Sequence, residues 1–363
     1  MTVASTEHAS TPDGAPGHKR FGDRLAERVA SRESQLVLGL DPDPMRLWPA
    51  ALRAPASDAE GSRAAASGAE DIHADASGAD DSSSAAPGET SDLAPQTSGA
   101  TAARARAARA VGAHCALAIE AAGEYCVAVK LQVACFERLG APGWAALADT
   151  VALARDRGLL VIADAKRGDI DVTATAYAQA FLGETPTPFG PVPGLGADAI
   201  TVNPLLGRDS IEPLLATARL HGRGLIVLVR TSNPGAADVQ ERELASGEAV
   251  SDRLADLVNQ IGRDGIGTSG LSDVGAVVGA TAPARLGALR ERMPHAAFLL
   301  PGVGAQGGRV EDLAPAFAPG PAGGLVAASR GIVAAHERVG GDPAGAAASE
   351  ARRLRDLAWR LAA

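Results

Sequence analysis

The sequence predicts an α/β protein built as a (β/α)8 TIM barrel, and two observations carry this prediction. Short apolar runs recur eight times along the chain, and each is followed by a stretch whose apolar residues have helical spacing. Regular alternation of strand and helix is typical of a parallel sheet, and eight such repeats favour closure into a barrel. A doubly wound open sheet is the alternative, and it would require some of these runs not to be strands.

The first expected element is a helix over residues 21–31, where apolar residues fall at helical spacing. Residues 1–18 are polar and rich in Ser, Thr, Gly and Pro, so we expect a disordered tail there. The first strand follows at residues 36–40 and ends in an Asp-Pro-Asp-Pro sequence that begins at Asp41. Because proline interrupts both strands and helices, Asp41 is expected on a loop at the carboxyl end of this strand.

The composition changes abruptly between residues 53 and 100. This segment consists mainly of Ala, Ser, Gly, Asp and Glu, and it carries a formal charge of −7 out of −9 for the whole chain. A segment with so few large apolar residues cannot bury enough surface to offset the entropy that is lost on ordering. We therefore predict a disordered acidic insertion after the first strand, within a single barrel domain that spans residues 19–363.

An alanine-rich helix is expected after the insertion, over residues 101–124. The remaining predicted strands are residues 127–131, 159–163, 199–202, 225–229, 274–279, 297–300 and 324–327. These runs are continuously apolar, which is typical of strands that are buried on both faces of a parallel sheet.

Composition and charge argue against several classes of protein. The formal net charge of −9 disfavours a nucleic-acid-binding surface. No run of 18 apolar residues occurs, so we expect no membrane-spanning helix. The three cysteines form no CxxC pair and are odd in number, and no secretory signal is recognisable, so we expect a reducing, cytoplasmic setting.

The stretch from Leu159 to Ile170 concentrates charge at the end of an apolar run. Asp164 and Lys166 are two residues apart, so their side chains project from the same face of an extended chain, and Asp169 follows on the turn. The carboxyl ends of buried strands are where α/β proteins place their active sites. An ion pair that only caps the strand is the alternative interpretation, because such pairs also gather at strand ends.

Lysine is rare in this chain, so the positions where it occurs are informative. Of the 34 Lys and Arg residues, only Lys19, Lys130 and Lys166 are lysines, and the last two lie at the ends of predicted strands. The protein environment can lower the pKa of a lysine enough for it to release a proton near neutral pH, whereas arginine stays charged. We therefore interpret Lys130 and Lys166 as candidates for proton chemistry.

In a barrel, the residues that follow the strands surround one common mouth. Here most of them are polar, in contrast to the strands: Asp41, Lys130, Asp164, Lys166, Asn203, Arg230, Ser232, Asn233, Thr281, Gln306 and Arg330. No histidine follows a predicted strand, and neither HxH nor HExxH occurs, so we expect no transition-metal site. The spacing of the aspartates at the strand ends does not exclude a Mg²⁺ ion that is bound by carboxylates.

Two loops predict a phosphate site. Residues 301–308 are rich in glycine and follow the seventh predicted strand, and Arg330 follows the eighth. Glycine lets backbone N–H groups approach an anion, these two loops of a barrel often bind phosphate, and arginine can bind it with two hydrogen bonds. A flexible turn is the alternative for either loop taken alone.

These residues resemble the motifs of the orotidine 5'-monophosphate decarboxylase family. Residues 164–170 with Thr173 match its DxKxxDIxxT signature, and the DAKRGDI form resembles that of the bacterial type 2 subfamily. The resemblance extends over roughly residues 20–340 outside the insertion. Further matching segments follow one another in order: residues 39–42, 129–132, 201–204, 230–235, 278–281, 301–308 and 329–330.

The resemblance implies the decarboxylation of orotidine 5'-monophosphate to uridine 5'-monophosphate (UMP) and CO₂, the final step of de novo UMP biosynthesis, without a metal or an organic cofactor. In the family, an alternating array of lysines and aspartates surrounds the pyrimidine ring. It corresponds here to Lys130, Asp164, Lys166 and Asp169. Lys166 would be the general acid that protonates C6.

Substrate-binding positions also follow from the resemblance. Asp41 and Lys130 match residues that contact the ribose, and Thr173 matches one that reaches a ribose hydroxyl. Ser232 matches one that contacts the pyrimidine edge, and Gln306 and Arg330 match phosphate ligands. The resemblance further implies a homodimer in which Asp169 and Thr173 enter the site of the neighbouring subunit.

Three other functions stay open on the sequence alone. A lysine at a strand end could form a Schiff base with a carbonyl substrate, as in class I aldolases. Related phosphate-binding barrels that act on sugar-acid phosphates share the DxK motif but need Mg²⁺. A non-catalytic nucleotide-binding protein is the third alternative, and it is disfavoured because four charged groups around one small volume are costly for binding alone.

Overall fold

The computed structural model describes residues 18–53 and 94–362. Within these ranges, eight parallel strands close into a barrel in the order β1-β10-β9-β8-β7-β6-β3-β2. The predicted (β/α)8 barrel is therefore confirmed, and the open-sheet alternative is wrong. The barrel strands are β1 (Leu36–Leu40), β2 (Ala128–Gln132), β3 (Leu160–Arg167), β6 (Ala199–Val202), β7 (Gly224–Arg230), β8 (Val274–Val278), β9 (Phe298–Pro301) and β10 (Gly324–Ala328).

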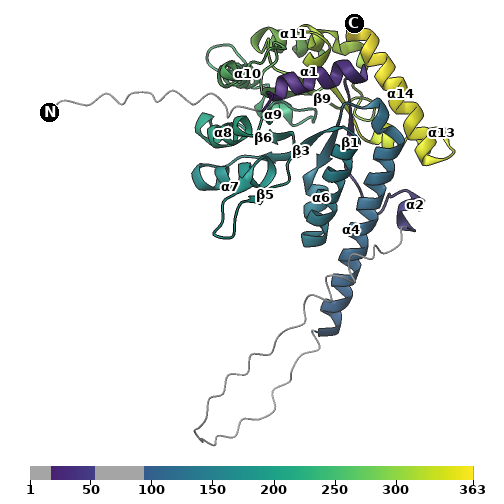
Figure 1. Cartoon of the computed structure of the whole chain (residues 1–363). Coiled ribbons are helices and arrows are strands. Elements are labelled where there is room, and N and C mark those ends of the chain that lie inside the picture. The colour runs from purple at the N-terminus through teal and green to yellow at the C-terminus, as the bar shows by residue number, and fades with distance from the viewer. Residues whose placement is uncertain (1–17, 54–93, 363) are drawn as a thin grey trace, which may run out of the picture.

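Helices surround the barrel, and α4 projects beyond it (Figure 1). The longer ones are α1 (Phe21–Arg32), α4 (Ala94–Ala122), α6 (Gly140–Asp156), α7 (Asp171–Phe181), α8 (Glu212–Leu220), α10 (Val250–Gly262), α11 (Pro283–Arg292) and α14 (Pro343–Ala362). Short helical segments are α2 (Pro49–Leu52), α5 (Val133–Glu137), α9 (Ala236–Val239), α12 (Arg330–Val333), α13 (His336–Val339) and the 3₁₀ helix η5 (Val310–Phe317). No helix among the described residues is long and apolar enough to cross a membrane.

The long helix α4 begins earlier than the sequence predicts. It starts at Ala94 instead of residue 101, so residues 94–100 of the predicted insertion are helical. Alanine is the strongest helix former, and residues 102–122 of this helix are rich in it, which favours extension of the helix toward its amino end. Residues 54–93 of the predicted insertion and residues 1–17 of the predicted tail lie outside the described residues.

Strand β3 is longer than predicted, because it continues through the charged residues to Arg167. The register between β3 and β6 shifts between Ala163 and Arg167, and Arg167 still pairs with Val202. Such a β-bulge inserts extra chain and re-aims a side chain without ending the strand. A short antiparallel hairpin, β4 (Glu184–Thr185) with β5 (Val192–Pro193), was not predicted; it lies between α7 and β6.

The barrel interior explains why the charged residues meet at one end. Side chains alternate along each strand, so Ala128 in β2 and Ile162 in β3 face the interior cluster. Phe21 and Leu25 of α1 belong to this same cluster, so α1 packs against the interior. Lys130 and Asp164 each follow an interior residue by two positions and therefore form the next layer toward the carboxyl end.

Arg290 of α11 joins the segments that lead into β9 and β10. Its buried guanidinium donates hydrogen bonds to the carbonyl oxygens of Met293, Ala296, Ala316 and Gly323, at 2.7–2.8 Å. It also lies 3.6 Å from the centre of the Phe298 ring. Burial lowers the pKa of Arg290 to about 9. These contacts fix the starts of the two strands that carry the predicted phosphate loops.

We expect Arg290→Met to lower the free energy of unfolding by about 3 kcal/mol or more, because buried carbonyl oxygens would lose their donors. Urea unfolding measures this change. Arg309→Met is the matched control, since the Arg309 side chain is 70% exposed and pairs only loosely with Glu311 at 3.6 Å. Equal, small losses for both variants would contradict the structural role of Arg290.

Candidate active site

Asp164 lies at the centre of an array of alternating charge at the carboxyl end of the barrel. Its Oδ2 accepts a hydrogen bond from Lys130 Nζ at 2.8 Å, and its Oδ1 accepts one from Lys166 Nζ at 2.6 Å. Lys130 Nζ also lies 3.5 Å from Asp41 Oδ1. The structure therefore brings four of the predicted site residues together, from strands β2 and β3 and from the loop after β1.

Burial differs across this array. The side chains of Lys130 and Asp164 are each 9% exposed, whereas that of Lys166 is 44% exposed. The inner pair is thus shielded from solvent, and the Lys166 ammonium lies on the open side. A molecule that enters the mouth from solvent can reach Lys166 directly.

The charges of the inner pair stabilise each other. Burial alone would raise the pKa of Asp164, but the ammonium groups of Lys130 and Lys166 outweigh it and lower this pKa to about 2. Burial alone would lower the pKa of Lys130, but Asp164 and Asp41 outweigh it and raise this pKa above its ordinary value. Asp164 and Lys130 are therefore both charged at neutral pH.

The backbone at Lys166 has an unusual conformation. Its φ is +50°, in the left-handed region that side chains other than glycine rarely adopt. The Lys166 amide donates a hydrogen bond to Thr201 Oγ1 at 2.9 Å, and Thr201 Oγ1 donates to Asp164 Oδ1 at 2.9 Å. Thr201 lies in one of the matching segments, residues 201–204, but no role was predicted for it. A hydroxyl within an otherwise apolar strand was the signal that could have identified it.

Three of the loops at the mouth converge on Gly302, which follows β9. A Cβ atom at this glycine would lie 3.0 Å from Gln306 Oε1, 3.1 Å from Ser232 Cβ and 3.2 Å from Thr281 Cγ2. Gly302 also has a φ of +101°, so this close approach needs glycine. The structure thus gathers Ser232 and Gln306, two predicted binding residues, around one point.

Two other polar residues at the strand ends hold loops instead of facing the mouth freely. The Arg230 guanidinium is largely buried, pairs with Glu241 at 2.6 Å and donates to Thr281 Oγ1 at 3.1 Å. Asn203 Oδ1 accepts a hydrogen bond from the amide of Leu205 at 3.1 Å. Arg230 therefore ties the loop after β7 to the loop after β8.

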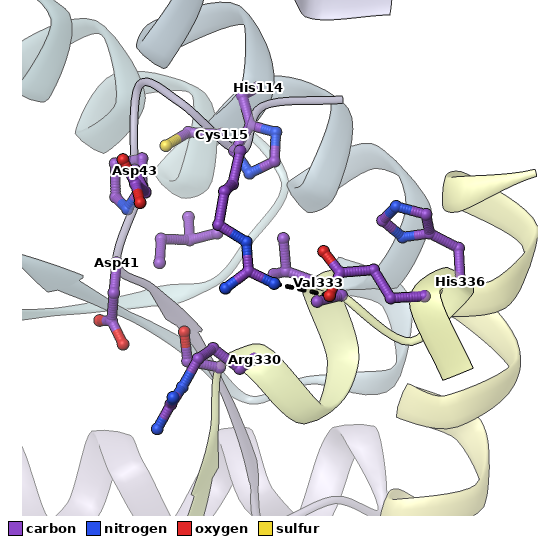
Figure 2. A pocket seen from close by; sticks show the side chains of 13 residues that line it. Asp41, Asp43, His114, Cys115, Arg330, Val333 and His336 are labelled. Atoms are coloured by element: carbon purple, nitrogen blue, oxygen red, sulfur yellow. Dashed lines mark hydrogen bonds and ion pairs between the residues drawn. The ribbon is translucent and has the colours of Figure 1, made fainter. Parts of the chain in front are cut away.

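A cavity of about 290 Å³ lies beside Asp41 and Arg330 (Figure 2). Arg46 and Glu337 both line it and form an ion pair at 2.6 Å. In Figure 2, the side chains of Asp41 and Arg330 point to the same side, away from His336. These two predicted binding residues thus share one wall between the barrel mouth and the cavity.

The deeper wall of this cavity is neutral. His114 Nδ1 accepts a hydrogen bond from the Trp48 amide at 3.1 Å, and burial together with the nearby His336 lowers the pKa of His114 to about 4. Burial raises the pKa of the Cys115 thiol. This wall was not predicted, because it joins α4 to the loop after β1 through contacts between residues that are distant in the sequence.

Asp169 and Thr173 lie outside the array of their own chain. Asp169 Oδ1 accepts a hydrogen bond from the Ile170 amide at 2.9 Å, and within residues 18–53 and 94–362 its carboxylate forms no ion pair. Thr173 is exposed in the first turn of α7. Beside them, Ile170 and Val172 are 50% and 82% exposed.

The donor groups at the mouth do not favour a metal ion. Among the described residues, no group of three or more His, Cys, Asp and Glu side chains could hold one. Both oxygens of Asp164 already accept hydrogen bonds from ammonium groups. A divalent cation at Asp164 would be repelled by the two positive charges.

Comparison with known proteins agrees with the motifs. A sequence model of the "Orotidine 5'-phosphate decarboxylase / HUMPS family" matches residues 101–341. The orotidine 5'-phosphate decarboxylase of Deinococcus radiodurans is 44% identical over 239 residues, which cover 66% of this chain and 81% of the relative. That of Haloarcula marismortui is 39% identical over 321 residues, 87% of this chain and 88% of the relative.

A solved structure extends the similarity to the fold. The structure of Leishmania donovani OMP decarboxylase aligns with a TM-score of 0.62 and 28% identity, and the alignment covers 94% of this chain and 98% of that chain. The sequence model of the family starts at residue 101, whereas the structure adds β1 and Asp41 on the other side of the insertion. This chain belongs to the orotidine 5'-phosphate decarboxylase / HUMPS family.

Proposed function

We propose that this protein decarboxylates orotidine 5'-monophosphate to UMP and CO₂, the final step of de novo pyrimidine biosynthesis. One observation carries the proposal: the Asp164 carboxylate lies between two ammonium groups at the mouth of a barrel. The relatives of 44% and 39% identity, which are orotidine 5'-phosphate decarboxylases, support it. That the chain belongs to the bacterial type 2 subfamily stays a prediction.

Lys166 is the residue that we assign as general acid. Loss of CO₂ leaves negative charge at C6 of the pyrimidine, and a fixed ammonium beside that carbon stabilises the charge and then donates a proton. The exposure of Lys166 on the open side of the array supports this role. The chemistry balances without a redox partner: the C6–carboxylate bond breaks, CO₂ leaves, and a proton from Lys166 forms the new C6–H bond.

Asp164 and Lys130 prepare this step. Asp164 would face the departing carboxylate, and its Oδ1 accepts the hydrogen bond from Lys166 Nζ at 2.6 Å, which holds this side chain in place. Lys130 neutralises the inner side of Asp164 and, through its contact with Asp41 at 3.5 Å, links the array to the proposed ribose site. The burial of this pair supports a site that is organised before substrate binds.

Different residues around the mouth would bind different parts of the substrate. Ser232 and Gln306, which meet around Gly302, would contact the pyrimidine edge and the phosphate respectively. Arg330, at the start of α12, would complete the phosphate site, and Asp41 would bind the ribose. Phosphate binding far from C6 supplies binding energy that orients the ring for reaction.

We propose a reaction without metal or organic cofactor. The two ammonium groups on Asp164 disfavour the Mg²⁺ that related barrels acting on sugar-acid phosphates need. They also argue against a Schiff-base lyase, because an ammonium that is paired with a carboxylate has no lone pair with which to attack a carbonyl carbon. A protein that only binds nucleotides would have little use for such an array.

We propose a homodimer in which Asp169 and Thr173 of each subunit enter the neighbouring site. The position of both residues outside their own array supports this, as does the exposure of Ile170 and Val172 beside them. We also propose a cytoplasmic setting, which the free thiols of Cys115, Cys126 and Cys135 support.

The direct test follows the loss of orotidylate by its ultraviolet absorbance, with and without EDTA. We expect stoichiometric formation of UMP at an unchanged rate in EDTA, and far slower turnover of the phosphate-free nucleoside orotidine. Activity that disappears in EDTA and returns with Mg²⁺ would favour the metal-dependent barrels instead. No turnover of orotidylate under either condition would contradict the proposal.

Lys166→Arg should lower kcat by at least about a thousandfold although the charge is kept, because arginine has a pKa above ~12 and is a poor proton donor. Steady-state kinetics measures the loss, and retained UMP binding shows that the site is intact. Lys19→Arg is the matched control, since Lys19 is exposed and pairs with Glu27 away from the array. If Lys166→Arg kept kcat within tenfold of the parent, Lys166 would supply charge only.

A further inference from the structure

Thr201 is a fully buried hydroxyl in the third position of the four-residue strand β6. Its neighbour two positions earlier, Ala199, belongs to the barrel interior, so Thr201 belongs to the same face one layer closer to the mouth. Strand β6 pairs with β3, where Asp164 occupies the corresponding layer. The hydroxyl therefore lies beside the array without being exposed to solvent.

The directions of its two hydrogen bonds are fixed by chemistry. The Lys166 amide can only donate, so Thr201 Oγ1 accepts that bond, at 2.9 Å. The single hydroxyl proton is then directed to Asp164 Oδ1, also at 2.9 Å. Because Asp164 is ionised, this second bond is charge-assisted and stronger than a bond between neutral groups.

These bonds close a ring that contains both ends of Lys166. The backbone amide of Lys166 is joined through Thr201 to Asp164 Oδ1, and the same oxygen accepts the hydrogen bond from Lys166 Nζ at 2.6 Å. The left-handed φ of +50° at Lys166 is strained for a residue other than glycine and persists only where neighbouring groups hold it. Thr201 is placed to hold it, directly beside the bulge in β3.

We propose that Thr201 is a positioning residue, which fixes the Lys166 ammonium relative to Asp164 for the decarboxylation. Because Thr201 is fully buried, it would act through the backbone of one catalytic residue and the carboxylate of another, and not by contact with the substrate. The proposal rests on the proposed function, because the effect of Thr201 on the Lys166 ammonium is measured as kcat for orotidylate. Displacement of a reacting group by about 1 Å can cost roughly a hundredfold in rate.

The test compares variants that keep or remove the hydroxyl. Thr201→Val keeps the shape of the side chain, and we expect kcat to fall by roughly 10–100-fold while KM and the affinity for UMP stay within about threefold of the parent. Thr201→Ser keeps the hydroxyl and should restore kcat to within about threefold of the parent. The split between kcat and KM distinguishes positioning from a general loss of structure.

Thr150→Val is the matched control, because Thr150 is buried in α6 and its hydroxyl donates to the Ala146 carbonyl oxygen at 2.7 Å, away from the array. We expect this variant to keep the parent kcat. If Thr201→Val does not fold, Thr201→Ala is compared with Thr201→Ser in the same way.

A kcat of Thr201→Val within twofold of the parent would overturn the positioning role, as would equal losses for the valine and serine variants. These outcomes leave the proposed function standing, because the parent would still convert orotidylate. A parent without orotidylate turnover would instead overturn the proposed function itself.

Discussion

The site depends on one buried carboxylate that three donors hold in place. Asp164 accepts hydrogen bonds from Lys130, Lys166 and Thr201. Moving an ion out of water costs several kcal/mol, so Asp164 can stay charged in this position only because its partners are present. The dependence is mutual, since Lys130 is equally buried and needs a carboxylate beside it. The array is therefore a unit that strands β2, β3 and β6 assemble together.

The barrel supplies this unit with a single open side. Apolar interior residues fill the layers below it, and α1 packs against them through Phe21 and Leu25. The next layer toward the carboxyl end holds Lys130, Asp164 and Thr201, on three strands that follow one another around the barrel. Because the lower layers are apolar and packed, the charged groups can meet a substrate only at the mouth.

Much of the fold follows from local sequence. The eight barrel strands were predicted because strands that are buried on both faces form continuous apolar runs, and strands such as Leu36–Leu40 agree at both ends. The extension of β3 was missed, since Asp164 and Lys166 are charges that normally end a strand and the bulge depends on pairing with β6. The β4–β5 hairpin was missed because its strands are only two residues long.

In the site, too, some residues could be predicted from local sequence and others could not. Asp41, Lys130, Asp164 and Lys166 were predicted together because parallel strands end at one mouth. Thr201 was assigned no role, because its hydroxyl in an apolar strand does not by itself reveal a partner, and only the structure shows its contact with Lys166. Arg230 was expected at the mouth, yet it holds a loop through Glu241, eleven positions further along, which strand periodicity does not reveal.

The most direct test of this account is the turnover of orotidylate by Asp164→Asn, measured beside the affinity of the same variant for UMP. The substitution keeps the size of the side chain and removes the charge that pairs with Lys130 and Lys166. The account predicts that kcat falls by at least about a thousandfold, which corresponds to about 4 kcal/mol, while UMP still binds and the protein stays folded. A variant with kcat within tenfold of the parent would contradict the central role of the Asp164 carboxylate.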